Sequence, residues 1–400
     1  MKKKIIGLIF LGISLLTVQA AAFEASEMLP KPDPFPVYPC LQTNVDFWKK
    51  VYTEYTLEQG IIHDSWNLAI IYEVVDLEDG DRPGAFMINK KRIKRAEEKY
   101  KSILTKLARG NPPSSPEEQR VIDLFGPTAT RKDFEQARRN MRCQLGQMDR
   151  FQEGIIRSGA CLEQIKEVFE SYGLPADLAY LPHVESSFNH EAQSKSRAAG
   201  IWQFTRPTGK RFLKIGQELD ERRDPIFSSH AAARLLRENY QVLGDWPMAI
   251  TAYNHGLGGM VKAKRTKKTY ETIFSEYRSR SFKFASRNFY SEFLAARDVA
   301  KSYRQYFGEI ELENPPSTHE VVVGNRVPVR DLARYFNVNV ADIKNLNPSL
   351  KESVYKGQKP LPRGYTLRLP LAIPAQTQEA PVTESATDLQ ESLREWNLIP

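Results

Sequence analysis

Apolar positions recur at two different spacings along this chain, and the helical spacing covers most of it. Through residues 151–305 they return every three or four positions, in segments separated by short polar turns. The alternation of apolar and polar residues that marks a strand is scarce there. Because a period of 3.6 residues places apolar side chains on one face of an α-helix, the pattern predicts a compact helical domain over 151–305.

The preceding region, residues 43–150, is also predicted to be mainly helical. Within 92–107, apolar side chains recur at helical spacing, at Ile93, Ala96, Tyr100, Ile103, Leu104 and Leu107. The run 67–75 is short and apolar, and it favours a strand. The segment 111–116 is rich in proline and serine and predicts a break, after which Glu117 begins another helix.

Residues 317–370 change character and predict a small β-α-α-β module. Their sequence favours strands at 319–323 and 365–369, with two amphipathic helices between them. Residues 371–400 are rich in Gln, Thr, Glu, Ser and Pro and hold too few apolar side chains to form a core, so a disordered tail is expected there. The expected fold class is therefore mainly α, with one small mixed module near the end of the chain.

The first residues have the pattern of an export signal. Lys2, Lys3 and Lys4 precede an apolar run of 14 residues that is followed by small residues, so residues 1–22 are predicted to be a secretory signal peptide. A membrane-spanning helix needs about 20 apolar residues, so this run is short for one, and retention of the segment as an anchor is the alternative. Residues 23–42 are proline-rich and predict an extended linker.

Charge and composition narrow the classes of partner and chemistry. The formal net charge is +8, and without the three N-terminal lysines the chain carries 54 basic and 49 acidic residues. A surplus this small, in a chain expected to be exported to the periplasm, argues against nucleic acid and suits an anionic polymer such as a cell wall. The histidines are scattered with no H-E-x-x-H spacing, and no G-x-S-x-G occurs, so neither a metal site nor a serine nucleophile is predicted, and no cofactor is expected.

The cysteines leave two interpretations open. Cys40, Cys143 and Cys161 are three in number, so in an oxidising compartment two could pair and one would be left over. The alternative is that some of them are small buried apolar side chains. The spacing does not choose between these interpretations.

Glu185 is the strongest candidate for a catalytic group. Pro175 and Asp177 favour the start of a helix, after which Leu178, Leu181, Val184 and Phe188 mark an apolar face beside Glu185. Desolvation by such neighbours raises the pKa of a carboxyl, as a general acid working near neutral pH requires. An isolated glutamate is far more often a surface or capping residue, so the assignment depends on the motifs around it.

Two further blocks could contact a carbohydrate. Gly200, Ile201, Trp202 and Gln203 combine a permissive glycine, a flat indole for sugar stacking and a hydrogen-bonding amide. Tyr253 and Asn254 supply a hydroxyl and a second amide, and the glycines after them lack the strand and the Lys-Ser/Thr pair of a phosphate-binding loop. Taken alone, Trp202 would more often belong to the core.

The order of these blocks resembles the catalytic domain of lytic transglycosylases, the goose-lysozyme-like family. YLPHVESSF, AAGIWQF and AYNHG stand in the family's order and resemble its membrane-bound lytic murein transglycosylase D type over about residues 151–275. The resemblance implies that Glu185 is the catalytic acid and base, and that Ser194, Gln203, Trp202, Tyr253 and Asn254 contact the substrate, with Tyr180 lining the cleft. The module at 317–370 resembles a LysM peptidoglycan-binding domain in its Asn345-Leu346-Asn347-Pro348 segment, although Gly324-Asn325-Arg326-Val327 replaces the usual Gly-Asp-Thr-Leu.

The resemblance also implies a reaction. Glu185 would protonate the β-1,4 glycosidic oxygen between N-acetylmuramic acid and N-acetylglucosamine, and then deprotonate the O6 hydroxyl that attacks C1 to give a 1,6-anhydromuramoyl end. Asp177, Glu191 and Asp224 are expected to start helices, cap turns or lie exposed, so Glu185 would act as a lone carboxyl. The alternatives are a lysozyme-like hydrolase and an inactive wall-binding scaffold, while residues 43–150 could recruit another cell-envelope protein.

Overall fold

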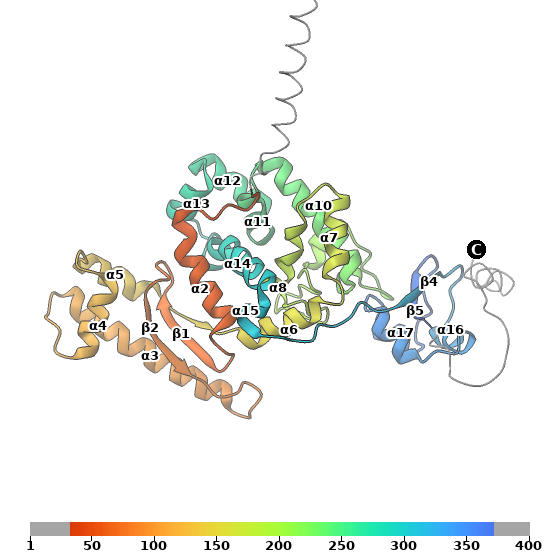
Figure 1. The fold of residues 1–400 in the computed structure, drawn as a ribbon, viewed down its shortest axis with the longest axis horizontal. Helices are drawn as coiled ribbons and strands as arrows, with labels where there is room; N and C mark the ends of the chain where they lie inside the picture. Colours follow the sequence, from red (N-terminus) through yellow and green to blue (C-terminus); the bar gives the residue numbers. More distant parts are fainter. Residues whose placement is uncertain (1–32, 372–400) are drawn as a thin grey trace, which may run out of the picture. The chain divides into compact units, whose positions relative to one another are not determined.

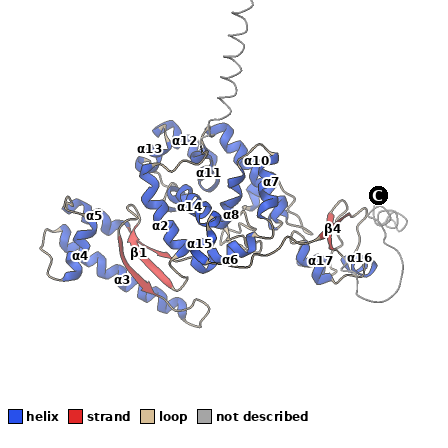
Figure 2. Ribbon diagram, in the orientation of Figure 1, coloured by secondary structure: helices blue, strands red, loops and turns tan. Residues whose placement is uncertain are grey.

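The computed structural model describes residues 33–371 of the 400-residue chain. The predicted signal peptide, most of the predicted linker and the predicted tail beyond Leu371 lie outside the described residues. The chain divides into two compact units at Pro36–Val37, and every element described below belongs to the second unit. Helices dominate it, and strands occur in only two places among the described residues, which agrees with the predicted mainly α fold class (Figure 2).

The N-terminal region contains a three-stranded antiparallel sheet in the order β2-β1-β3. Its strands are β1 (Gln59–Asp64), β2 (Ile71–Asp76) and β3 (Met141–Leu145). Three helices accompany the sheet: α3 (Ala85–Ala108), α4 (Pro116–Phe125) and α5 (Arg131–Asn140). The short apolar run indeed forms β2, but the sequence pattern missed β1 and β3, which pair with each other from 77 or more residues apart, as between Asp64 and Met141.

Local capping explains where α4 begins. The hydroxyl of Ser115 accepts a hydrogen bond from the backbone N–H of Glu118, and Pro116 occupies the first turn of α4. This arrangement satisfies a helix N–H that would otherwise lack a partner. The apolar faces of α3 and α4 then meet one side of the sheet in a shared core, which includes Ile62, Tyr72, Tyr100, Leu104, Val121 and Phe134.

A helix at the start of the unit corrects the predicted linker. Pro39–Leu41 forms a 3-10 turn, η1, and α2 (Gln42–Thr53) follows it directly. The Asn44 side-chain amide donates to the side-chain oxygen Oδ1 of Asn288 at 2.7 Å, so this bond connects α2 to the later helix α14 (Phe284–Lys301). Folded structure therefore begins before residue 42, because η1 precedes α2 and the side chains of Phe35 and Leu41 are fully buried.

The remaining helices form the lobe that carries the candidate site (Figure 1). Helix α14 is buried along most of its length and packs against α2, α8 and α11. The elements, apart from α14, are α6 (Met148–Ser158), α7 (Leu162–Ser171), η2 (Ala176–Tyr180), α8 (Leu181–Glu185), α9 (Arg206–Gly209), η3 (Glu221–Arg223), α10 (Pro225–Leu243), α11 (Trp246–His255), α12 (Leu257–Lys267), α13 (Tyr270–Glu276) and α15 (Tyr303–Phe307).

The C-terminal module has the predicted order of elements plus one short helix. Its elements are β4 (Thr318–Val322), α16 (Val329–Tyr335), α17 (Val340–Leu346), α18 (Glu352–Tyr355) and β5 (Thr366–Pro370). The two strands pair antiparallel. One residue from the helical lobe, Leu219, belongs to the hydrophobic core of this module.

Polar contacts accompany the insertion of Leu219. The backbone N–H of Asp220 donates to the Ser349 carbonyl at 2.6 Å, and the N–H of Lys351 donates to the Glu218 carbonyl at 2.9 Å. The guanidinium of Arg368 on β5 bonds the carboxylate of Asp224, whose side chain is fully buried, at 2.6 Å. The module is thus joined to the helical lobe by backbone pairing, apolar burial and a buried ion pair.

Three further features of residues 33–371 concern the cysteines, the length of the apolar helices and the grouping of metal-ligating side chains. Cys40, Cys143 and Cys161 are all free thiols, which settles the disulfide question in favour of no pairing in this structure. No helix there is long and apolar enough to cross a membrane. No group of three or more His, Cys, Asp or Glu side chains within the same range could hold a metal ion.

Candidate active site

Glu185 is the last residue of the short helix α8. His183 anchors this helix, since its ring is buried and stacks on Phe151 with the ring centroids 5.1 Å apart. The helix ends because Ser187 and Phe188 both adopt left-handed backbone conformations, with φ of 51° and 55°. Each such residue costs about 1 kcal/mol or more, which the burial of Phe188 offsets. The chain therefore reverses direction immediately after Glu185.

The turn after Glu185 is held from a neighbouring helix. The Arg157 guanidinium on α6 donates to the Ser187 carbonyl oxygen from Nε at 3.0 Å and from Nη2 at 2.9 Å. The hydroxyl of Ser186 donates to the Ile201 carbonyl at 2.9 Å. These bonds fix the position of the Glu185 backbone between α6 and the loop that carries the second motif.

The surroundings of Glu185 suit a proton donor. Burial raises the pKa of its carboxyl to about 8, and desolvation is the cause. Leu181 and Phe188 beside it are almost completely buried, as the sequence pattern predicted for its apolar neighbours. The Glu185 side chain itself keeps intermediate solvent exposure, so a substrate can reach it. A carboxyl that is protonated at neutral pH and reachable is equipped to act as a general acid.

Gln203 closes the loop that carries the second motif. Its side-chain amide nitrogen donates to the Gly200 carbonyl at 2.9 Å and to the Ala192 carbonyl at 3.3 Å. Gly200 has φ of 78°, and a Cβ there would lie 1.7 Å from the Arg222 carbonyl oxygen, so only glycine fits. The donor group of Gln203 is thus engaged by the protein, which leaves its carbonyl oxygen as the group that could meet a sugar.

Trp202 does not provide the predicted surface for sugar stacking. Its side chain is fully buried and packs against Phe169, with ring centroids 5.5 Å apart. The indole N–H donates to the Ser229 hydroxyl at 2.7 Å. Trp202 is therefore a core residue, because a large apolar ring with a single donor is satisfied by packing and one internal hydrogen bond.

Tyr253 joins the second and third motifs to Glu185. Its hydroxyl donates to the Trp202 carbonyl at 2.7 Å. Burial raises the pKa of the Tyr253 phenol well above its usual value, and the nearby charge of Glu185 raises it further. The neighbouring Asn254 is exposed, and its side-chain oxygen accepts a hydrogen bond from the Ser286 hydroxyl on α14 at 2.9 Å. The structure therefore brings Tyr253 near Glu185 and places Asn254 at the adjoining surface.

Two other predicted contact residues have internal partners. The Ser194 hydroxyl accepts from the backbone N–H of Ala198 at 3.0 Å and lies 2.9 Å from the Ser196 hydroxyl, so it stabilises the turn in which it stands. Tyr180 was expected to line the cleft, but it is buried, and its ring lies 5.4 Å from the Lys166 ammonium. That expectation is corrected because the ring of Tyr180 is used in packing.

A second carboxyl near Glu185 was missed. Glu292 lies on α14, which packs against α8, and its side chain has the same intermediate exposure as that of Glu185. Burial raises the pKa of Glu292 to about 8, with the charge of Glu185 adding to the rise and that of Arg142 opposing it. Glu185 therefore has a second carboxyl in its surroundings, and the expectation that it acts alone in catalysis stays a prediction. A signal was present, since one acid interrupts the apolar run 289–294.

The other acids considered from the sequence have the predicted structural roles. Asp177 is in the first turn of η2 and pairs with Lys301 at 2.6 Å. Asp224 caps α10 by accepting from the backbone N–H groups of Ile226 and Phe227. Glu191 is exposed in its loop.

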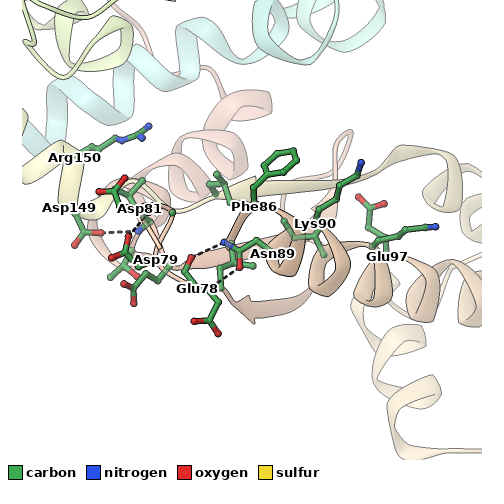
Figure 3. A pocket seen from close by; sticks show the side chains of 17 residues that line it. Glu78, Asp79, Asp81, Phe86, Asn89, Lys90, Glu97, Asp149 and Arg150 are labelled. Carbon is green, nitrogen blue, oxygen red and sulfur yellow. Dashed lines mark hydrogen bonds between the residues drawn. The ribbon is translucent and has the colours of Figure 1, made fainter. Parts of the chain in front are cut away.

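A large cavity in the N-terminal region is separate from this chemistry. It measures about 1140 Å³, and Figure 3 shows Phe86, Asn89 and Lys90 of α3 among the side chains that line it. Asn89 closes one side, since its amide nitrogen donates to the Glu78 carbonyl at 2.8 Å. None of the predicted site residues lines this cavity.

Comparison with known proteins agrees with the geometry around Glu185. The family model of the transglycosylase SLT domain matches residues 165–274. The chain therefore contains a transglycosylase SLT domain. The matched range includes Glu185, Gln203, Tyr253 and Asn254, whereas Glu292 lies beyond it.

Relatives of the SLT domain extend this finding. The chain is 30% identical over 195 residues to membrane-bound lytic murein transglycosylase D of Escherichia coli K12, which covers 47% of the chain and 42% of that protein. The protein of the same name from Escherichia coli O6:H1 matches to the same extent. A putative tributyltin chloride resistance protein of Alteromonas is 38% identical over 96 residues, which covers 24% of the chain and 46% of that protein. The chain spans less than half the length of each of these relatives.

Proposed function

We propose that this chain is a peptidoglycan lytic transglycosylase with Glu185 as its acid and base. One observation carries the proposal: the SLT domain presents a reachable carboxyl whose pKa is raised by burial to about 8. Such a group holds its proton at neutral pH and can give it to a leaving oxygen. The substrate would be a glycan strand cut between N-acetylmuramic acid and N-acetylglucosamine.

The reaction needs the same carboxyl twice. Protonated Glu185 donates to the β-1,4 glycosidic oxygen, and the N-acetyl group of the substrate stabilises the cation that forms at C1. The ionised Glu185 then removes the proton from the O6 hydroxyl of the muramic residue as O6 attacks C1. The proton balance closes on Glu185, no water is consumed, and the product is a 1,6-anhydromuramoyl end.

Tyr253 and Asn254 are assigned positioning roles in this proposal. The Tyr253 hydroxyl is held against the Trp202 carbonyl, close enough to Glu185 for the two groups to interact electrostatically. Asn254 is exposed at the end of α11, where its amide can meet the N-acetyl group or a hydroxyl of the sugar. The Gln203 carbonyl oxygen is the third candidate contact.

The product test is direct. Purified protein is incubated with peptidoglycan, and the released muropeptides are analysed by mass spectrometry. We expect muropeptides with 1,6-anhydro ends, each lighter by one water than the hydrolysis product. Release of reducing ends alone would refute the transglycosylase assignment, and no release of glycan would support an inactive scaffold.

One observation favours the hydrolase as a second candidate. Most glycosidases use two carboxylates, and the structure places Glu292 near Glu185. In a hydrolase, Glu292 would activate the water or attack the sugar, so its loss would remove most activity. In the transglycosylase, Glu292 only influences the protonation of Glu185.

Replacing Glu292 by Gln separates the two candidates. Under our proposal the variant stays active, but its loss of activity at high pH begins at a lower pH than in the wild type. The reason is that the charge of Glu185 raises the pKa of Glu292, and since such coupling is mutual, an ionised Glu292 would oppose ionisation of Glu185. Its removal should therefore lower the pKa of the acid that must stay protonated. The measurement is the pH dependence of kcat/KM from pH 5 to 10. A loss of about a hundredfold or more at every pH would instead indicate a second catalytic carboxyl.

Location and partners follow as further parts of this proposal. We place the protein in the periplasm on the basis of its predicted signal segment, which lies outside the described residues. The C-terminal module is proposed as a LysM-like element, and its binding to glycan stays a prediction. Recruitment of a cell-envelope protein by residues 43–150 also stays a prediction.

A further inference from the structure

A second cavity lies between the loop that follows Glu185 and the C-terminal module. It measures about 660 Å³. One wall is formed by residues 190–223 of the helical lobe, and the other by residues 344–355 of the module. Leu219 holds the module in this position, because its side chain lies in the core of the module and its backbone pairs with that of Leu350. Both walls of the cavity therefore belong to one packed structure.

The cavity has a surplus of positive charge. The cationic side chains that line it are Arg197, Arg206, Arg222, Arg223, Lys344 and Lys351. Only three carboxylates line it, and two of these are already paired within the cavity wall, Asp220 with Arg222 and Glu352 with Lys344. Glu191 is the remaining carboxylate. Four cations therefore face one carboxylate among the described residues.

Two of the four remaining cations are held by neutral groups, and the other two are exposed. Arg223 donates to the Glu191 backbone carbonyl at 3.1 Å and to the Gln193 side-chain oxygen at 3.3 Å. The Lys351 ammonium donates to the Gly216 carbonyl at 2.6 Å. Arg197 and Arg206 are exposed. Since a carbonyl oxygen does not neutralise a cation, the charge of all four stays open to an anionic ligand.

The cavity wall that belongs to the helical lobe is held in place by internal hydrogen bonds. The Arg222 guanidinium is buried and donates from Nη1 to the backbone carbonyls of Arg197 and Phe204, both at 2.9 Å. The loop between these two residues carries Gln203, whose amide is bonded to the Ala192 carbonyl. The same loop thus forms the cationic wall and supports the motif beside Glu185.

We propose that this cavity binds the carboxylates of the peptide stems that branch from the glycan strand. The inference rests on the proposed function, because it assumes that a glycan strand reaches Glu185. Guanidinium groups match carboxylates in shape and charge. The tyrosine that lines the cavity, Tyr355, is buried, so the surface offers little for stacking a bare sugar. The cavity thereby distinguishes strands that carry peptides from strands that have lost them.

The test measures binding to peptidoglycan in a protein that cannot digest it. Glu185→Gln is the background, and Arg197→Ala with Arg206→Ala removes two exposed cations from the cavity. The control is Lys91→Ala with Arg95→Ala, which removes two exposed cations from α3, far from the cavity lining in the sequence. Two exposed ion pairs together change binding by roughly three- to tenfold, so we expect the cavity variant to bind insoluble peptidoglycan that much more weakly and the control to be unchanged.

Two treatments of the peptidoglycan identify the source of the anion. Removal of phosphate polymers with hydrofluoric acid should leave the difference between the proteins intact, and removal of the peptide stems with an amidase should abolish it. Equal binding by the cavity variant and its background, or loss of the difference after the acid treatment alone, would overturn the proposal. Binding is measured here without turnover. A negative result for the cavity is therefore distinguishable from a negative result for the proposed function, which would be the absence of anhydro products in the wild-type assay.

Discussion

Glu185→Gln is expected to lower the rate of glycan cleavage by about a thousandfold while the protein stays folded. A positioned general acid contributes roughly a hundred- to ten-thousandfold, and here the same group would also act as the base. Glutamine keeps the size and hydrogen-bonding groups of the side chain but cannot supply the proton. The measurement is the rate of soluble muropeptide release, with Glu191→Gln as the control because that carboxyl is exposed in its loop.

The same substitution is expected to raise the stability of the fold at alkaline pH and to leave it nearly unchanged at acidic pH. The folded-state pKa of Glu185 is raised to about 8 from an ordinary value of 4.5. Stability that depends on the protonated carboxyl is therefore fully present below pH 4.5 and is lost as the pH rises through about 8. Glutamine does not ionise, so Glu185→Gln should melt at a higher temperature than the wild type at pH 8.5 and at a similar temperature at pH 4.5. A variant that melts lower at both pH values would show that Glu185 has a structural role, and its lost activity would then not identify the catalyst.

The second large effect is a loss of stability, and it is expected at the junction of the helical lobe and the C-terminal module. Arg368→Met should lower the free energy of unfolding by about 3 kcal/mol, near the lower end of the range for breaking a buried ion pair. The Asp224 carboxylate is fully buried, and the substitution removes its charge partner while leaving the two backbone N–H groups of α10 that it also accepts from. Chemical denaturation measures the change.

A matched variant shows how much stability is lost when any other arginine at the junction of the helical lobe and the C-terminal module is removed. Arg326→Met removes an exposed arginine that pairs with Glu218 at 2.8 Å across the same junction. Its side chain is 55% exposed, and such pairs contribute about 1 kcal/mol or less. Equal effects of the two substitutions would contradict the assignment of the Arg368–Asp224 bond as the main polar contact.

Sequence reasoning succeeded where short-range pattern determines structure. The apolar neighbours of Glu185 predicted its desolvation, because Leu181 stands four residues earlier on the same face of α8. The capping role of Asp224 was visible from the proline that follows it. The helix over 92–107 was also predicted, although α3 extends further in both directions.

Prediction from the sequence failed where the structure depends on contacts between segments that are far apart in the chain. The sheet pairs Gln59–Asp64 with Met141–Leu145, and no local pattern specifies a partner so far away. Glu292 lies 107 residues after Glu185 in the sequence, and it comes near Glu185 only because α14 packs against α8. Trp202 was misjudged because a tetrapeptide does not tell which way an indole points, and here Ser229 and Phe169 decide it.

The place of Leu219 bears on how this protein can be dissected. A truncated form that stops before Thr318 would expose a leucine that is 9% exposed in the whole structure and would leave the Asp224 carboxylate without its arginine. Loss of activity in that truncated form would therefore not show whether the C-terminal module binds peptidoglycan. A module taken from another protein would need an apolar pocket that accommodates Leu219. The helical lobe and the C-terminal module therefore need to be kept together in any engineered form, even though their sequence patterns suggest two separable pieces.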